Sequence, residues 1–128
     1  MRYTLDRLIE NVDIDAVDAR TREALDEQGF VVLTEIDVRA TMKKQLDIDM
    51  PPYRILGVCN PQMAYRAIGM EPRVGAMLPC NVILRRLDDD VEISAVDPVA
   101  SMQAIDNAEL KAVAWQVRAL LADVVKSV

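Results

Sequence analysis

The spacing of apolar residues along this chain predicts where its helices and strands lie. Residues 107–126 carry apolar side chains at intervals of three and four over four turns, which is typical of an amphipathic helix. Asp106 is predicted to cap this helix, and Glu109, three residues later, would complete a capping box. The apolar stripe consists of Leu110, Val113, Ala114, Val117, Leu120, Leu121 and Val124.

Shorter apolar runs, several of them rich in β-branched residues, predict strands. These runs cover residues 2–9, 30–36, 53–59, 81–87 and 91–96. The run at 30–36 is expected to be covered on at least one face. Asp88-Asp89-Asp90 separates the last two runs and predicts a hairpin turn.

Capping residues mark the helices between these strands. Asp13 or Asp15 can begin a helix that ends near Gln28, where Gly29 supplies the left-handed position beyond the helix. Asp37 can cap a helix over 38–47, with Val38, Met42 and Leu46 on one stripe. Asn60-Pro61 predicts a helix that stops near Gly69, a loop or loose turn is expected from there to Pro79, and Asp97-Pro98 predicts a short helix.

The predicted order is therefore β-α-β-α-β-α-β-β-α within one domain of 128 residues. Helices on one side of a largely antiparallel sheet are the natural arrangement for this order, which is an α+β fold.

Charge and composition exclude several classes of function. The net charge is −6, and no basic stripe is present that could neutralise a phosphate backbone, so nucleic acid and anionic membranes are not expected partners. The chain has no histidine, which removes Ser-His and Cys-His dyads and the commonest metal ligand. We expect neither a metal nor a cofactor.

No apolar run approaches the roughly 20 residues that span a bilayer, and residues 1–7 form no signal core. We therefore expect a cytosolic protein with both thiols reduced.

Four segments together resemble a known family. They are Thr-Glu-Ile-Asp-Val at 34–38, Pro-Tyr-Arg-Ile-Leu-Gly-Val-Cys-Asn-Pro at 52–61, Pro-Cys-Asn-Val at 79–82 and Ala-Val-Asp-Pro at 95–98. In order and spacing they resemble the domain-of-unknown-function 302 family, and the resemblance covers almost the whole chain, 1–128. It implies a fold like that of the TATA-box-binding protein, with a curved, mainly antiparallel sheet and helices packed on one face. The family's name assigns no biochemical activity.

Cys59-Asn60 and Cys80-Asn81 are the best candidates for a functional site. If their strands run antiparallel, the end of the first lies beside the start of the second, and the thiols share one edge of the sheet. If the strands run parallel, a strand length of about 20 Å separates them. A shared edge would supply two sulfurs, two amides and the N-terminus of the helix at Asn60, which can lower a thiol pKa. The alternative is that both cysteines are core filler, that Asn60 is only a cap and that Asn81 is only a turn residue.

Glu35 and Arg54 form a second candidate pair. Each lies in an apolar strand run, and buried charges are normally paired, so we expect them to contact each other. Glu35 could act as a general base or ligand-binding carboxylate. The structural alternative is an ion pair or a position at a solvent-facing edge.

The last helix has a second apolar face. Trp115, the chain's only tryptophan, lies opposite the main stripe. Small residues lie beside it at Ala108, Ala112, Ala119 and Ala122. Tryptophan is enriched at the centres of protein interfaces, so a homodimer or partner contact through Trp115, Ala112 and Ala119 is one interpretation. The other is an ordinary exposed face of good helix formers.

Taken together, the sequence favours a non-catalytic protein that binds a small ligand, a sulfur species or a protein partner. The alternatives are a thiol-dependent redox enzyme or sulfur carrier that uses Cys59 or Cys80, and a structural subunit of a homo-oligomer.

Overall fold

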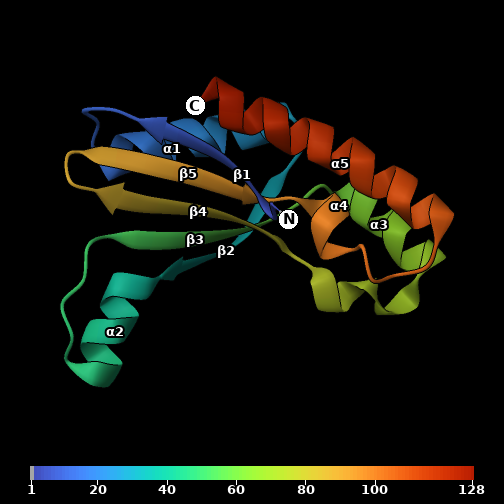
Figure 1. Ribbon diagram of the computed structural model, residues 1–128, viewed down its shortest axis with the longest axis horizontal. Helices are drawn as coiled ribbons and strands as arrows, with labels where there is room; N and C mark the ends of the chain where they lie inside the picture. The colour runs from blue at the N-terminus through green and yellow to red at the C-terminus, as the bar shows by residue number, and fades with distance from the viewer. Residues whose placement is uncertain (1) are drawn as a thin grey trace.

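The computed structural model describes residues 2–128, which form a single sheet with helices around it (Figure 1). The strands are β1 (Thr4–Ile9), β2 (Val31–Asp37), β3 (Tyr53–Cys59), β4 (Cys80–Leu87) and β5 (Asp90–Val96). The α-helices are α1 (Ile14–Glu27), α2 (Val38–Leu46), α3 (Pro61–Met70), α4 (Pro98–Ser101) and α5 (Ala108–Ser127). A 3-10 helix, η1 (Pro72–Met77), occupies the region where the sequence predicted a loop or loose turn.

All neighbouring strands are antiparallel, in the order β1-β5-β4-β3-β2. The sheet is open, with β1 and β2 at its two edges. In the pairing of β3 with β4, Val58 lies opposite Cys80 and Gly57 lies opposite Asn81. The two cysteines therefore lie at the same end of adjacent strands, as the antiparallel alternative requires.

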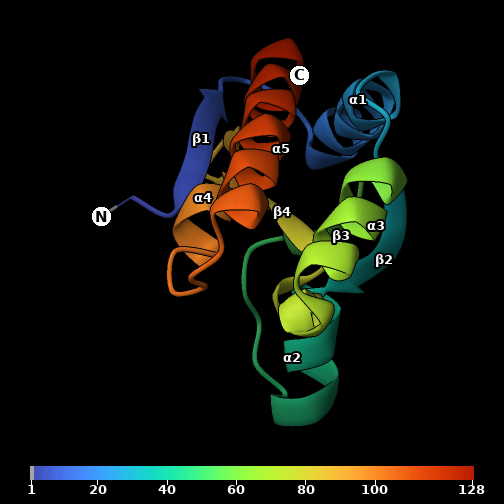
Figure 2. The same ribbon diagram turned by 90° about the vertical axis from the view of Figure 1, so that its right-hand side faces the viewer.

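Two long helices cover one face of this sheet (Figures 1 and 2). α1 contacts β2 and β4, α5 contacts β1 and β5, and the two helices also contact each other. The main core lies between them and the sheet, and a smaller core lies where α3, η1, α4 and α5 meet. The predicted α+β architecture with helices on one face is thus confirmed, and Leu110, Val113, Ala114, Leu121 and Val124 are buried as their spacing predicted.

The predicted caps at Asp37, Asn60 and Asp97 are confirmed, because each side chain accepts a hydrogen bond from the first turn of its helix. The prediction for the last helix was wrong by one residue. Asn107, rather than Asp106, caps α5, and its Oδ1 accepts from the Leu110 amide at 3.0 Å. The Asn107 Nδ2 also donates to the Met70 carbonyl at 3.2 Å, so this cap joins α5 to the end of α3, which Asp106 has no N–H to do.

The segment of β2 and α2 departs most from expectation. The predicted apolar stripe of α2 packs against no core, because this helix has no buried residue. β2 is an edge strand with almost all of its residues exposed rather than a strand covered on one face. Of the residues described, no helix is both long enough and apolar enough to cross a bilayer.

Candidate functional site

A half-enclosed apolar pocket lies where the end of β3 and the start of β4 meet α3 and α5. Cys59 and Cys80 both line it, as does Asn60 at the start of α3. The remaining wall is almost entirely hydrocarbon and thioether: Phe30, Val58, Met63, Ala64, Ala67, Leu78, Pro98, Met102, Val113, Ala114 and Val117. The topology therefore brings the two cysteines of the chain into one site.

Both thiols are reduced, and burial sets their ionisation. Cys80 is 6% exposed, and burial, reinforced by the nearby Cys59, raises its pKa to about 11. Burial also raises the pKa of the more accessible Cys59. The sequence raised the possibility that the N-terminus of α3 lowers a thiol pKa, whereas burial moves the pKa of both thiols upward. Both groups are therefore neutral thiols at pH 7.

The two asparagines do not share the site. The Asn60 side chain faces the start of α3, where its Oδ1 accepts from the Met63 amide and its Nδ2 donates to the Gln28 carbonyl, each at 3.3 Å. Asn81 is exposed and alternates along β4 with the buried Cys80 and Val82, which places its side chain on the open face of the sheet. The site therefore contains one amide rather than two.

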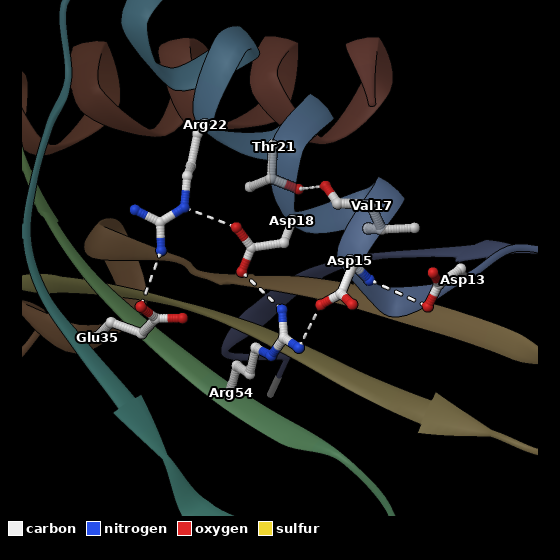
Figure 3. Close-up of polar contacts among 8 residues, drawn as sticks. All are labelled: Asp13, Asp15, Val17, Asp18, Thr21, Arg22, Glu35 and Arg54. Atoms are coloured by element: carbon white, nitrogen blue, oxygen red, sulfur yellow. Dashed lines mark hydrogen bonds and ion pairs between the residues drawn. The ribbon is translucent and has the colours of Figure 1, made fainter.

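Glu35 and Arg54 lie away from the pocket, and the predicted contact between them was wrong. Arg54 contacts two carboxylates of α1 instead, Asp15 at 2.6 Å and Asp18 at 3.2 Å (Figure 3). Glu35, which is half exposed at the sheet edge, contacts Arg22 at 3.3 Å, and Arg22 in turn contacts Asp18 at 2.6 Å. Arg22, a residue of α1 that the sequence did not single out, thus joins the two predicted residues into one chain of ion pairs under α1 (Figure 3).

The ion pairs of Arg54 link β3 to α1. The carboxylates of Asp15 and Asp18 hold the pKa of Arg54 above its usual range, so its charge is fixed. No buried side-chain nitrogen or oxygen among residues 2–128 lacks a hydrogen-bond partner. The contacts of Glu35 and Arg54 therefore support the structural alternative over a general base.

Comparison with known proteins identifies the family and the fold. The profile described as "Domain of unknown function DUF302" matches residues 7–128. The chain belongs to this family. A crystal structure of an uncharacterized conserved DUF302 protein from Bacillus stearothermophilus has the same fold, with a TM-score of 0.92 and 24% sequence identity. The match covers 99% of this chain and 98% of the other. No curated protein matches the chain.

In this DUF302 protein, Trp115 lies on the outer side of α5, with 57% of its surface exposed. The guanidinium carbon of Arg118 lies 5.6 Å from the centroid of its ring. Ala112 and Ala119 are exposed on the same helix. Trp115 borders a hollow of about 180 Å³ that it forms with Val99, Met102, Gln103, Lys111 and Ala114, and Met102 and Ala114 also line the thiol pocket.

The sequence did not assign several residues that line the thiol pocket. Met63 and Met102 add two thioethers, and Phe30, the chain's only phenylalanine, adds an aromatic surface. Val113 and Val117 belong to the predicted stripe of α5, but periodicity alone does not separate pocket lining from core. The proximity of α3 and α5 decides this, and it is a tertiary property.

Proposed function

We propose that this DUF302 protein is a cytosolic, non-catalytic binding protein whose ligand is a small, neutral sulfur species held in the pocket between α3 and α5. The proposal rests on one observation: Cys59 and Cys80, both protonated thiols, line the same pocket, whose wall is otherwise almost entirely apolar.

The volume of the pocket supports a very small ligand. Its space amounts to about 30 Å³. This is room for about two or three water-sized groups, since each needs roughly 10–15 Å³. Organic cofactors occupy pockets of about 300–1,000 Å³ and would not fit without a large movement of α3.

The chemistry of the wall supports a neutral and polarisable ligand. Of the lining residues described, none carries a formal charge, so a buried anion or cation would lose hydration without gaining a partner. Thiol, thioether and hydrocarbon groups interact well with soft sulfur and poorly with groups that need strong hydrogen bonds. A small thiol or sulfide satisfies both conditions.

The raised thiol pKa values count against the alternative, a thiol-dependent redox enzyme or sulfur carrier. The thiolate is the nucleophile in such reactions, and reactive cysteines lie in electropositive surroundings that lower their pKa. Here burial raises the pKa of both cysteines instead.

The proposal can be tested by two-dimensional amide NMR with a matched pair of probes, ethanethiol and ethanol. We expect millimolar ethanethiol to shift the amide resonances of Cys59, Cys80 and Val113 in a saturable way. Ethanol has a similar size, but its hydroxyl would be buried without a partner, so it should leave these resonances in place.

A filled pocket provides the control. Ala64 lines the pocket, and Ala64→Leu should abolish the ethanethiol shifts, whereas Ala19→Leu on the exposed surface of α1 should leave them intact. Equal shifts with both probes, or shifts that survive Ala64→Leu in a folded variant, would contradict the proposal.

A further inference from the structure

The segment 31–49, which we call the arm, exposes an unusual amount of apolar surface. It contains five of the twelve large apolar residues that are exposed within residues 2–128. Their exposed fractions are 48% for Val31, 58% for Leu33, 46% for Ile36, 60% for Leu46 and 51% for Ile48. In Figure 1 the helix of the arm, α2, stands apart from the other helices, beyond the end of β2.

α2 contacts β3, and Val38 and Met42 are half-buried, but a short helix with so little packing is hard to explain in a monomer. α2 has nine residues, whereas isolated helices shorter than about 12–15 residues are marginal in water and normally need tertiary packing. Both ends of α2 have polar contacts. Asp37 caps the first turn, and Lys43 pairs with Asp47 at 2.9 Å and with Asp49 at 3.4 Å. These exposed contacts contribute little to the stability of the helix, and no residue of α2 is fully buried.

β2 adds an unpaired backbone edge to this apolar surface. It is the last strand of the sheet, so the side that faces away from β3 has no strand partner within residues 2–128. The register with β3 shifts between Val32 and Thr34, which leaves Thr34–Asp37 as the regular part of the strand. Such an edge is a template for another strand, which charges, proline or a covering element can block. Of the two charges on β2, Glu35 is paired with Arg22 and Asp37 caps α2.

The charges indicate what covers the arm. Within α2 the charged residues are Arg39, Lys43 and Lys44, all of them basic, in a chain with a net charge of −6. Lys43 is already paired with Asp47 and Asp49, so Arg39 and Lys44 are the cations that a partner could meet. The C-terminal turn of α1 shows the opposite excess, because it contains Asp26 and Glu27 and no basic residue. Carboxylates at a helix C-terminus are unfavourable, and among residues 2–128 neither forms an ion pair.

Pairing with a second β2 brings these opposite charges together. α1 leads through residues 28–30 into the start of β2, and α2 follows directly from its end. If two copies of Thr34–Asp37 pair antiparallel about a two-fold axis, the first turn of each α2 lies level with the start of the other β2. The basic residues of α2 then lie near the acidic end of α1 in the other copy.

We infer that the arm is a homodimer interface, in which β2 pairs with β2 of a second copy and α2 packs beside α1 of that copy. The same surface is used twice, as a two-fold dimer requires, and the two sheets join into one continuous antiparallel sheet. Leu33, Ile36 and Leu46 supply the apolar centre of the interface.

Sedimentation equilibrium of the full chain tests this inference. Wild type should sediment at twice the 14.3 kDa chain mass at micromolar concentrations. Leu33→Lys places a charge on the edge, and Leu46→Glu places one on α2, so each should raise the dissociation constant at least 100-fold. Circular dichroism should show that both variants remain folded, because neither residue is buried.

A charge exchange tests the partner surface. Arg39→Glu and Glu27→Arg should each weaken the dimer about 10-fold, and the double variant should recover most of that loss. Trp115→Ala is the matched control for the rival surface on α5 and should leave the dissociation constant unchanged. The inference would be overturned by a wild-type monomer at every concentration up to 0.5 mM (roughly a hundred times the expected dissociation range), or by a dimer that Trp115→Ala dissociates and Leu46→Glu does not.

Discussion

Asn60 and Gln28 join two helices that are far apart in the sequence. The side-chain N–H of Asn60 donates to the carbonyl of Gln28 at 3.3 Å, while its Oδ1 caps α3 at the Met63 amide, also at 3.3 Å. The same amide group therefore begins α3 and fixes it to the end of α1, next to the pocket.

We expect Asn60→Ala to lower the free energy of unfolding by about 1–2 kcal/mol, because a cap and a hydrogen bond are both lost. Asn60→Asp keeps the cap but aims a carboxylate oxygen at the Gln28 carbonyl, so it should remain less stable than wild type. Urea unfolding of the three proteins measures both effects. A stability of Asn60→Asp equal to that of wild type would show that the contact with Gln28 contributes nothing.

Gly57 is required by close packing on the open face of the sheet. A Cβ at this position would overlap the Thr34 hydroxyl and would lie 2.9 Å from Cγ of Pro79. Gly57→Ala should therefore destabilise the protein by about 1–3 kcal/mol, as overpacking does in general. Thr34→Ala should restore part of the loss, because it removes one of the two overlaps. Gly69→Ala in α3 is the control: nothing lies within 4 Å of its added methyl, so it should be neutral or stabilising.

Arg54 connects β3 to α1 through two separate carboxylates. Arg54→Met should lower the free energy of unfolding by about 1–2 kcal/mol, since Asp18 is largely buried and loses one of its two cationic partners. Arg54→Lys should also destabilise, because one ammonium cannot reproduce the fork that reaches both carboxylates. Thermal unfolding of these variants can be compared with Arg20→Met, an exposed position on α1 with no ion pair among the described residues, where we expect no change.

The burial of Cys80 should lower the free energy of unfolding at high pH. Its pKa is about 11 in the folded protein against an ordinary value of 9.0, so the unfolded chain releases this proton first as the pH rises. The free energy of unfolding keeps its full value below about pH 9 and falls between about pH 9 and 11. The upper limit of this loss is about 2–3 kcal/mol. Urea unfolding at pH 8 and pH 10.5, under reducing conditions, should show a larger decrease for wild type than for Cys80→Val. Parallel decreases in the two proteins would contradict this assignment.

The thiols should also react slowly with an aromatic disulfide reagent at pH 7.5. We expect Cys59 to react more slowly than a free cysteine and Cys80 to react only when the protein opens, because burial disfavours both thiolates. Cys59→Ser and Cys80→Ser separate the two rates. Fast stoichiometric reaction of either thiol in the native protein would favour the redox alternative instead.

Local signals predicted most of the fold. Asn60-Pro61 and Asp37 begin helices as expected, and the stripe of α5 is buried where its spacing repeats every three and four residues. Antiparallel strands then brought Cys59 and Cys80 together at one end of the sheet. These features depend on short segments or on the order of the elements, both of which can be read from the sequence.

Other features depended on which surface each element meets. The stripe of Val38, Met42 and Leu46 gave no indication that α2 contacts β3 without burying any of its residues. Glu35 and Arg54 both form ion pairs, but their partners lie on α1. The sequences of the two strands do not show that α1 provides these partners. The direction of the thiol pKa shifts depends on burial, which the sequence around Cys59 does not reveal. The likeness to the TATA-box-binding protein stays a prediction.

The order of the strands also constrains how the protein is made on the ribosome. β2, β3, β4 and β5 pair with their neighbours in sequence and can associate as they emerge. β1 is synthesised first, yet its partner is β5, and Thr4 lies opposite Val96. The first strand must therefore wait until residue 96 has been made before it can pair, and until then it has no strand partner.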